Sequence, residues 1–158
     1  MISIIKKAGN IKIVFILMIL LFGTSCALKP IVSEYTFIKK DLEKVDLEKL
    51  GDGNVLIYNG ANIFHKIDNT ARLNIWIDNR ALGQIKPSEY VIINLKKGNY
   101  KIKILHIDLV NIRSNHDVII DNETKIIKVK PTFASNKLEI INELPKNFNK
   151  FKYAGKKK

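Results

Sequence analysis

The stretch of sequence that decides the fold class is IWIDNRALGQIKPSEYVIINLKKGNYKIKIL, from Ile75 to Leu105. Around its start, residues of two kinds alternate: apolar Leu73, Ile75 and Ile77 are interleaved with Arg72, Asn74 and Trp76. A period of two is typical of a half-buried β-strand. Asp78-Asn79 then predicts a tight turn, because Asn adopts a positive φ more readily than most other non-glycine residues. The segment therefore begins with a predicted β-hairpin.

Two glycines in the same stretch are expected to mark special backbone positions. Leu82–Ile85 is the expected return strand, and Gly83 within it predicts a bulge or a close backbone approach. Gly98 lies between Val91–Leu95 and the longest predicted strand, Tyr100–Val110. We expect these two strands to form a hairpin in which Gly98 has a positive φ.

The rest of the chain after Asn54 also consists of short apolar or alternating runs separated by turn residues. Further strands are predicted at Val55–Tyr58, Val118–Ile120, Thr124–Val129 and Leu138–Ile141, with a loop at Ser114-Asn115. Only one helix is expected, near residues 39–50, where Leu42, Val45, Leu47 and Leu50 are spaced along one face. The pattern predicts an all-β domain over residues 54–145, a small antiparallel β-sandwich or a partly open barrel.

The N-terminus has the features of an export signal. Three lysines precede an uninterrupted apolar run from Ile13 to Phe22, and no acidic residue occurs before Cys26. The ten residues of this run fall well short of the roughly 20 that span a bilayer as a helix, and they match the apolar region of a signal peptide. An uncleaved anchor that continues to Leu28, or a plain secretory signal, are the alternatives.

The apolar run ends in Gly23-Thr24-Ser25-Cys26, which resembles the lipobox of bacterial lipoproteins. The resemblance implies a signal peptide over residues 1–25, cleavage between Ser25 and Cys26, and acylation of Cys26. Gly23 replaces the usual leucine of this motif. By the same resemblance, Ala27 in place of an aspartate directs the anchored protein to the outer membrane of a Gram-negative envelope. Cys26 is the only cysteine, so the mature chain cannot form an internal disulfide.

Removal of residues 1–25 from the 158-residue chain leaves 133 residues, enough for one domain. It also removes three lysines, which lowers the formal net charge from +12 to +9. Such a charge attracts anionic lipid, but the abundance of Ile, Lys and Asn also fits codon bias, and no nucleic-acid partner is predicted. Residues 26–53 are expected to be a lipidated tether with the short helix. Residues 146–158 form a basic tail, interleaved with Phe148, Phe151 and Tyr153, that is expected to fray or to adhere to lipid.

The segment from Ile75 to Leu105 resembles PEGA-type β-domains and related bacterial lipoprotein domains. Their pattern of a strand, an IDG turn, an LG pair and L-x-x-G-x-Y is carried here by Ile77-Asp78, Leu82-Gly83, Leu95, Gly98 and Tyr100. Asn79 replaces the usual glycine after the aspartate. The resemblance covers 31 residues and consists of turn motifs, so it implies a small β-sandwich at the cell envelope and no reaction.

The sequence contains no arrangement of residues that predicts catalysis, a metal site or a cofactor. His106 and Asp108 share one side of a predicted strand, and His116-Asp117 fall in the expected loop, but we interpret them as a satisfied strand histidine and a loop cap. His65 belongs to neither pair. Trp76 and Tyr100 are the candidate ligand surface, although Trp76 is also explained by packing in a second core.

Two functions are therefore considered. In the first, the lipid holds a structural or protein-interaction module at the membrane, where it contacts an envelope protein. In the second, a pocket near Trp76 and Tyr100 binds a glycan or small molecule. A deep apolar pocket between the sheets would favour ligand binding, and a filled interior would favour the interaction module.

Overall fold

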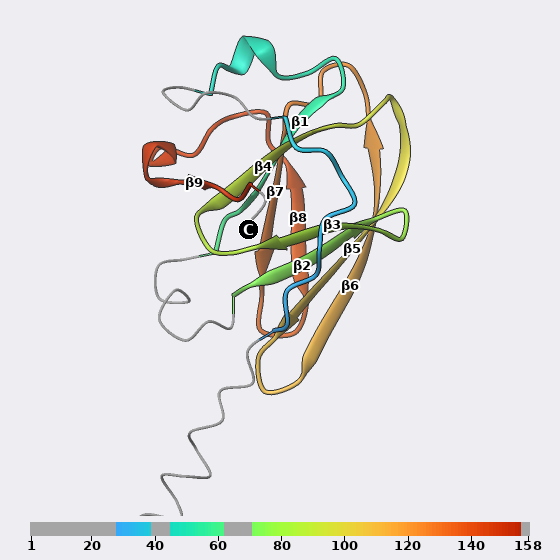
Figure 1. Cartoon of the computed structure of the whole chain (residues 1–158), viewed down its shortest axis with the longest axis vertical. Coiled ribbons are helices and arrows are strands. Elements are labelled where there is room, and N and C mark those ends of the chain that lie inside the picture. Colours follow the sequence, from blue (N-terminus) through green and yellow to red (C-terminus); the bar gives the residue numbers. More distant parts are fainter. Residues whose placement is uncertain (1–27, 39–44, 62–70, 156–158) are drawn as a thin grey trace, which may run out of the picture.

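The computed structural model describes residues 28–38, 45–61 and 71–155. They form an all-β sandwich of two sheets (Figure 1), which confirms the predicted fold class. The strands are β1 (Asn54–Asn59), β2 (Leu73–Ile77), β3 (Arg80–Ile85), β4 (Glu89–Asn94), β5 (Gly98–Ile107), β6 (Asn111–Ile120), β7 (Ile126–Pro131), β8 (Asn136–Ile140) and β9 (Lys152–Tyr153). One sheet has the order β8-β7-β1-β4-β9, and the other has the order β3-β2-β5-β6. In the described residues, no helix has the length and apolar character needed to cross a membrane.

The predicted β2–β3 hairpin is confirmed. Asp78 and Asn79 connect the strands with φ values of 48° and 65°, the left-handed conformation that the turn requires. Asp78 also fixes the hairpin to β5, because its carboxylate accepts a hydrogen bond of 2.8 Å from the backbone N–H of Lys101. The register shifts opposite Ile75 and Trp76, where Gly83 has a φ of 116°. The bulge expected at Gly83 is therefore present.

The hairpin expected between Val91–Leu95 and Tyr100–Val110 is wrong. β4 pairs with β1 in the five-stranded sheet, whereas β5 pairs with β2 and β6 in the other, so the chain crosses between sheets after β4. Gly98 is already the first residue of β5, opposite Ile120, and its φ is not positive. The five-stranded sheet also contains two parallel pairs, β1 with β7 and β4 with β9, where only antiparallel pairing was expected.

The β5–β6 hairpin is longer than the sequence suggests. β6 begins at Asn111 rather than Val118, and the turn lies at residues 108–110. Ser114-Asn115 and His116-Asp117, for which the sequence predicts a loop, therefore lie within a strand. The prediction failed because exposed polar residues alternate with half-buried ones over much of β6, so the strand has little apolar signal.

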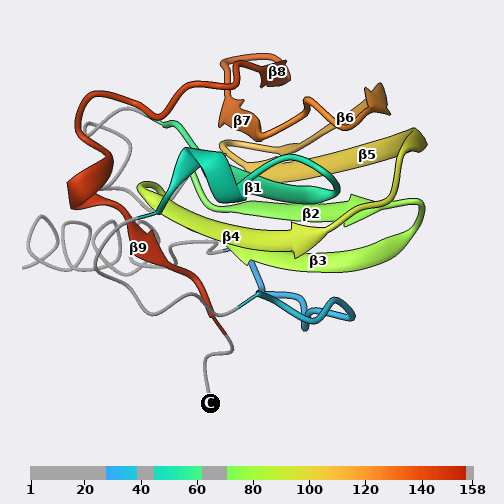
Figure 2. The same ribbon diagram turned by 90° about the horizontal axis from the view of Figure 1, so that it is seen from above.

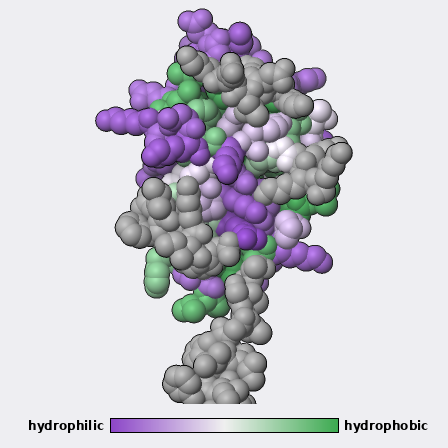
Figure 3. All heavy atoms as spheres, turned by 60° about the vertical axis from the view of Figure 1, so that its left-hand side comes forward, coloured by the Kyte–Doolittle hydropathy of each residue, from purple (hydrophilic) through white to green (hydrophobic). Residues whose placement is uncertain are grey.

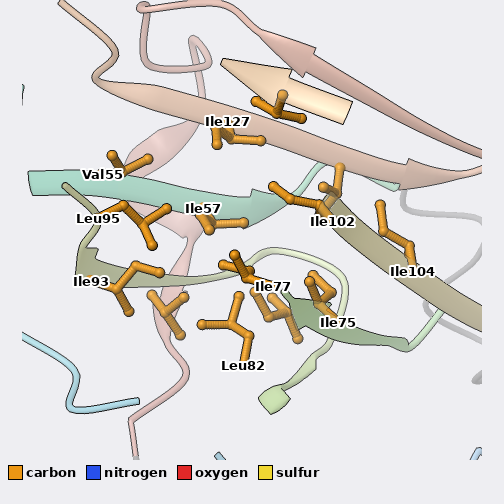
Figure 4. Packing of buried hydrophobic residues seen from close by; sticks show 14 of the residues in the cluster. Val55, Ile57, Ile75, Ile77, Leu82, Ile93, Leu95, Ile102, Ile104 and Ile127 are labelled. Atoms are coloured by element: carbon orange, nitrogen blue, oxygen red, sulfur yellow. The ribbon is translucent and has the colours of Figure 1, made fainter. Parts of the chain in front are cut away.

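Apolar side chains from both sheets fill the space between them (Figure 4). Most of the cluster is aliphatic, and residues such as Ile57, Ile75, Ile93 and Ile104 have at most 1% of their surface exposed. The alternating apolar residues of β2, β4 and β5 all contribute to this core. Because such burial stabilises by about 25 cal/mol per Å² of apolar surface, the cluster is the main source of the fold's stability.

Residues 28–38, expected to belong to a tether, are part of the domain and will be called the strap. The backbone N–H of Glu34 donates to the carbonyl of Ala81 on β3, and that of Ile38 donates to the carbonyl of Ile92 on β4, both at 2.8 Å. The strap therefore connects the free edge of β3 in one sheet to β4 in the other. Figure 2 shows it in blue alongside β3. Covering edge strands in this way prevents pairing with other chains.

The C-terminal segment up to residue 155 is also part of the fold, so the expected fraying is wrong for this part. The short 3₁₀ helix η3 (Phe148–Lys150) precedes β9, which pairs with β4. Phe151 makes an edge contact with Tyr58, with 5.3 Å between ring centroids, and a stacked contact with Phe148. These rings cover the outer face of the five-stranded sheet, and burial raises the pKa of Tyr58.

The helix expected near residues 39–50 can be assessed only from residue 45 onward. Here the chain forms a single 3₁₀ turn, η1 (Leu47–Lys49), and Asp46 caps it by accepting a hydrogen bond from the N–H of Glu48. Leu42 lies outside the described residues. Together with the strap and β9, this turn extends the domain on both sides of the expected range of 54–145.

Candidate functional site

A cavity of about 580 Å³ lies at the side of the sandwich, beneath the strap. Its walls come from the strap, β3, β4, the residue before β2, the residue after β3 and the two residues after β9. The lining residues are Pro30, Ile31, Val32, Ser33, Phe37, Arg72, Leu82, Gly83, Gln84, Ile85, Lys86, Val91, Ala154 and Gly155. The volume lies within the range of 300 to 1,000 Å³ that is typical of small-molecule pockets.

The bulge in β3 allows the strap to lie close to the strand at this point. A Cβ atom on Gly83 would lie 3.5 Å from the Cβ of Ser33, so a larger side chain would push the strap away. The carboxylate of Glu34 accepts a hydrogen bond of 3.0 Å from the backbone N–H of Ala81, which adds to the backbone bond between these residues. The outer wall of the cavity is therefore fixed to the strand that forms its inner wall.

An aromatic ring holds the strap on the far side of the bulge. The hydroxyl of Tyr35 donates a hydrogen bond of 3.2 Å to the carbonyl of Ile77, and the guanidinium of Arg80 lies 4.4 Å from the ring centroid. Burial raises the pKa of Tyr35, and the nearby Arg80 charge opposes this shift. The phenol therefore stays neutral and keeps its hydroxyl proton for the bond to Ile77.

The cavity is apolar on one side and cationic on another. Leu82, Ile85 and Val91 form a wall of core residues that are each only 1% exposed. Of the polar groups, the Gln84 amide is bonded to the carbonyl of Leu28 and to Asn74, and the Ser33 hydroxyl is bonded to Tyr35. Arg72 and Lys86 supply positive charge, and the carboxylate of Glu89 lies beside Lys86, where it accepts a hydrogen bond of 2.9 Å from the backbone N–H. This combination suits a ligand with an apolar body and an anionic group.

The candidate ligand surface of Trp76 and Tyr100 is wrong. Trp76 pairs with Lys103, and both side chains lie on the face of the sheet opposite to Ile75 and Ile104, which point into the core. Tyr100 lies on the inner face and packs against that core, and its hydroxyl donates to the carbonyl of Lys96 at 2.7 Å. The two rings are therefore on opposite faces and cannot contact one ligand.

The histidines of the described chain have structural surroundings. His106 is 3% exposed, and its Nδ1 lies 2.7 Å from Oδ1 of Asn136, which confirms a satisfied strand histidine. His116 lies within β6, where its Nε2 is 3.0 Å from the hydroxyl of Ser114. Burial lowers the pKa of His116, while a hydrogen bond with the backbone of Asn136 acts in the opposite direction. Within residues 28–38, 45–61 and 71–155, no group of three or more His, Cys, Asp or Glu is placed to hold a metal ion.

Other predicted site residues cannot be placed. Ser25, Cys26 and His65 lie outside the described residues. Conversely, no sequence pattern indicates the roles of Ile31, Arg72 and Lys86 in the cavity, because the cavity walls come from segments far apart in the chain. The only local signal was Gly83, which was expected to permit a close backbone approach.

Comparison of the chain with protein families, curated proteins and solved structures finds no match. The resemblance to PEGA-type domains thus stays a prediction from the turn motifs.

Proposed function

We propose that the protein is an envelope lipoprotein, anchored through Cys26, that binds an amphiphilic anion in the cavity beneath the strap. The ligand class is an apolar chain ending in a carboxylate or phosphate. The observation that carries the proposal is the pairing of an apolar wall, Leu82, Ile85 and Val91, with the cations Arg72 and Lys86. An acyl chain would lie against the wall, and its head group would lie near the cations.

The anchor supports this choice of ligand. The strap begins at Leu28, two residues after Cys26, so an acylated Cys26 would hold the cavity close to the bilayer surface. Two residues of extended chain span at most about 7 Å. Lipids and their fatty acids are the most abundant amphiphilic anions in that position.

The filled interior supports a second candidate, the interaction module. The cluster between the sheets consists of buried side chains from both sheets, and the cavity lies at the side of the sandwich rather than in its centre. In this alternative the sandwich is a rigid body that presents its surface to an envelope protein, and the cavity has no ligand.

A photoreactive fatty acid tests the proposal directly. The full chain, purified in a non-ionic detergent, is illuminated with a palmitic acid analogue that carries a diazirine, and the labelled peptides are identified by mass spectrometry. We expect labels in residues 30–37 and 82–91, and roughly tenfold weaker labelling with the neutral methyl ester, the equivalent of about 1.4 kcal/mol. Labels scattered over the whole surface would contradict ligand binding.

Charge variants give the matched control. Arg72→Gln with Lys86→Gln should lower labelling by the fatty acid to the level of the ester, because the anionic head loses both cations. Lys97→Gln removes an exposed charge outside the cavity and should leave labelling unchanged. Equal effects of both changes would mean that the net charge of the protein, and not the cavity, attracts the probe.

A further inference from the structure

Three large apolar side chains are exposed on two turns of the sandwich. Leu109 and Val110, in the turn between β5 and β6, are 96% and 66% exposed, and Phe133, in the turn between β7 and β8, is 90% exposed. Single exposed apolar residues are common on protein surfaces. A set of three at turn tips, where polar residues are usual, calls for an explanation when the tips lie together.

Hydrogen bonds show that the two turns lie at one end of the molecule. His106 pairs with Ile112 one residue pair away from the first turn, and Asn136 follows the second turn. The side chain of Asn136 bonds to His106 and donates to the carbonyl of Ile112 at 3.4 Å. Figure 1 shows both turns at the lower end of the sandwich, and Figure 3 shows hydrophobic surface at that end. We will call it the tip end.

The described chain also begins toward the tip end. The carbonyl of Lys29 accepts a hydrogen bond of 2.8 Å from the Asn74 amide, and Asn74 pairs with Leu105, three residues before the β5–β6 turn. In Figure 1 the start of the strap, in blue, lies low in the sandwich, near these turns. Since Cys26 is two residues before Leu28, covalent geometry keeps its Cα within about 7 Å of that of Leu28.

Positive charge accompanies the apolar tips. Lys29 and Arg113 are exposed. Lys130 is half-buried and directly precedes the last residue of β7, after which the second turn begins. Arg113 is the third residue of β6 after the β5–β6 turn. Asp108 is the acidic residue within that turn. Apolar side chains flanked by cations match the interface of an anionic bilayer, where the apolar groups are buried among the acyl chains and the cations meet phosphates.

We infer that the tip end is a membrane-contact surface, in which Leu109, Val110 and Phe133 insert into the lipid interface beside the N-terminal attachment point. The lipid on Cys26 would hold one point of the domain at the bilayer, and a second site of contact fixes the orientation of the domain on it. The inference rests on the proposed anchor at Cys26, is separate from the proposed ligand, and concerns how the domain lies on the bilayer. The long axis of the β5–β6 hairpin would then point toward the membrane.

The chain offers an internal control at the opposite end. Ile119 is 70% exposed and lies at the far end of β6, where it pairs with Asn99. It is an exposed apolar residue on the hairpin whose turn contains Leu109, but it lies at the other end of that hairpin. A general affinity of exposed apolar residues for lipid would affect both positions, whereas the inferred orientation affects only the tip end.

The test uses a fluorescent label at one position at a time. Leu109→Cys, Phe133→Cys and Ile119→Cys are each introduced into the full chain that retains Cys26 and is processed and acylated in the cell. Because Cys26 is the only native cysteine and its thiol is then acylated, NBD labels the introduced cysteine alone. The labelled proteins are reconstituted into vesicles of phosphatidylethanolamine and phosphatidylglycerol. We expect emission from positions 109 and 133 to shift to shorter wavelengths and to be quenched by lipids with a doxyl group on the acyl chain. Position 119 should show neither effect.

Two results would overturn the inference. If positions 109 and 133 behave like a label in water, the tip end does not touch lipid and is left for a protein partner or a second copy of the chain. If position 119 is quenched as strongly as the other two, the domain has no fixed orientation on the bilayer. Neither result depends on the cavity ligand, because no ligand is added.

Discussion

Nδ1 of His106 lies 2.7 Å from Oδ1 of Asn136, so a buried polar contact ties a strand of one sheet to a strand of the other. The amide nitrogen of Asn136 donates to the carbonyls of Ile104 and Ile112, at 3.3 and 3.4 Å. Because this nitrogen is the donor, Oδ1 is the acceptor, and His106 must carry a proton on Nδ1. Asn136 therefore satisfies groups on two strands of the opposite sheet.

Asn136→Ala should lower the free energy of unfolding by about 2 to 4 kcal/mol. The change leaves the ring N–H of His106 and two carbonyls without this partner, and each unsatisfied buried group costs about 1 to 3 kcal/mol. Asn115→Ala, an exposed position on β6, is the control and should change stability by less than about 0.5 kcal/mol. Urea unfolding of both variants measures the difference, and equal stabilities would contradict a structural role for the contact.

Gly83 and Gly98 should respond differently to the same substitution. Gly83→Ala places a side chain at a φ of 116°, so it should destabilise the protein by about 1 to 3 kcal/mol. Gly98 lacks a positive φ, and a Cβ there would meet only Tyr100 at an ordinary 3.8 Å. Gly98→Ala should be neutral, or stabilising by up to about 1 kcal/mol, because it reduces the entropy of the unfolded chain. Thermal melts that rank the two variants in the opposite order would exclude the bulge geometry.

Removal of one aromatic ring should show that the C-terminal segment stabilises the domain. Phe151→Ala deletes contacts with Tyr58 and Phe148, and a partly buried ring should cost about 1.5 to 3 kcal/mol, less than the 3 to 5 kcal/mol of a fully buried one. Phe133→Ala removes an exposed ring and should have almost no effect in detergent solution. Chemical denaturation distinguishes the two, and a neutral Phe151→Ala would mean that the segment is docked without contributing stability.

His116 should make stability depend on pH in a defined direction. Burial lowers its folded pKa below the ordinary value of 6.5, so between the two pKa values the unfolded chain binds more protons. Stability contributed by the neutral ring is present above pH 6.5 and is lost as the pH falls through 6.5 toward the folded pKa. The slope is at most about 1.4 kcal/mol per pH unit for one group.

His116→Gln provides the comparison for this titration. The variant cannot titrate at this position. The wild type should therefore lose stability relative to the variant as the pH falls from about 7.5 to 5.5. Denaturant melts at several pH values measure it. A difference that does not change with pH would show that the ring is not desolvated in the folded state.

Cys26→Ser should abolish incorporation of a fatty acid if this thiol and the amino group exposed by cleavage are the acceptors. Labelling cells with an alkyne fatty acid, followed by gel analysis, tests the point. Ser25→Thr changes the residue before the cleavage site without removing the thiol, and should retain label. A labelled Cys26→Ser protein would exclude Cys26 as the anchor.

The strands that could be predicted are those with a complete local signal. β2 alternates between apolar and other residues over its whole length, and Asp78-Asn79 suits the turn that follows it. β6 lacks such a signal because it lies at an edge of its sheet and is largely exposed, so its first half was assigned to a loop. Gly98 shows a different failure, since a glycine between two apolar runs fits a hairpin and a crossing between sheets equally well.

The candidate site could not be predicted, for a related reason. The cavity brings together Ile31, Lys86 and Ala154, which are remote in the chain and share no pattern. The strap that closes the cavity is held by hydrogen bonds from its backbone to strand edges. Backbone groups are the same in almost every residue type, so such bonds cannot be recognised in the sequence. The prediction that Trp76 and Tyr100 form one ligand surface failed because only the register of the sheet determines which face each ring occupies.

The strap determines where a recombinant version of the domain has to begin. A shortened protein that starts at Asn54 would contain every strand of the two sheets, yet it would lack the groups that pair with Ala81 and Ile92. Unpaired strand edges are templates on which other chains add, so such a protein is prone to aggregate even though its core is intact. Crystallisation and binding studies should therefore retain the chain from Leu28 onward.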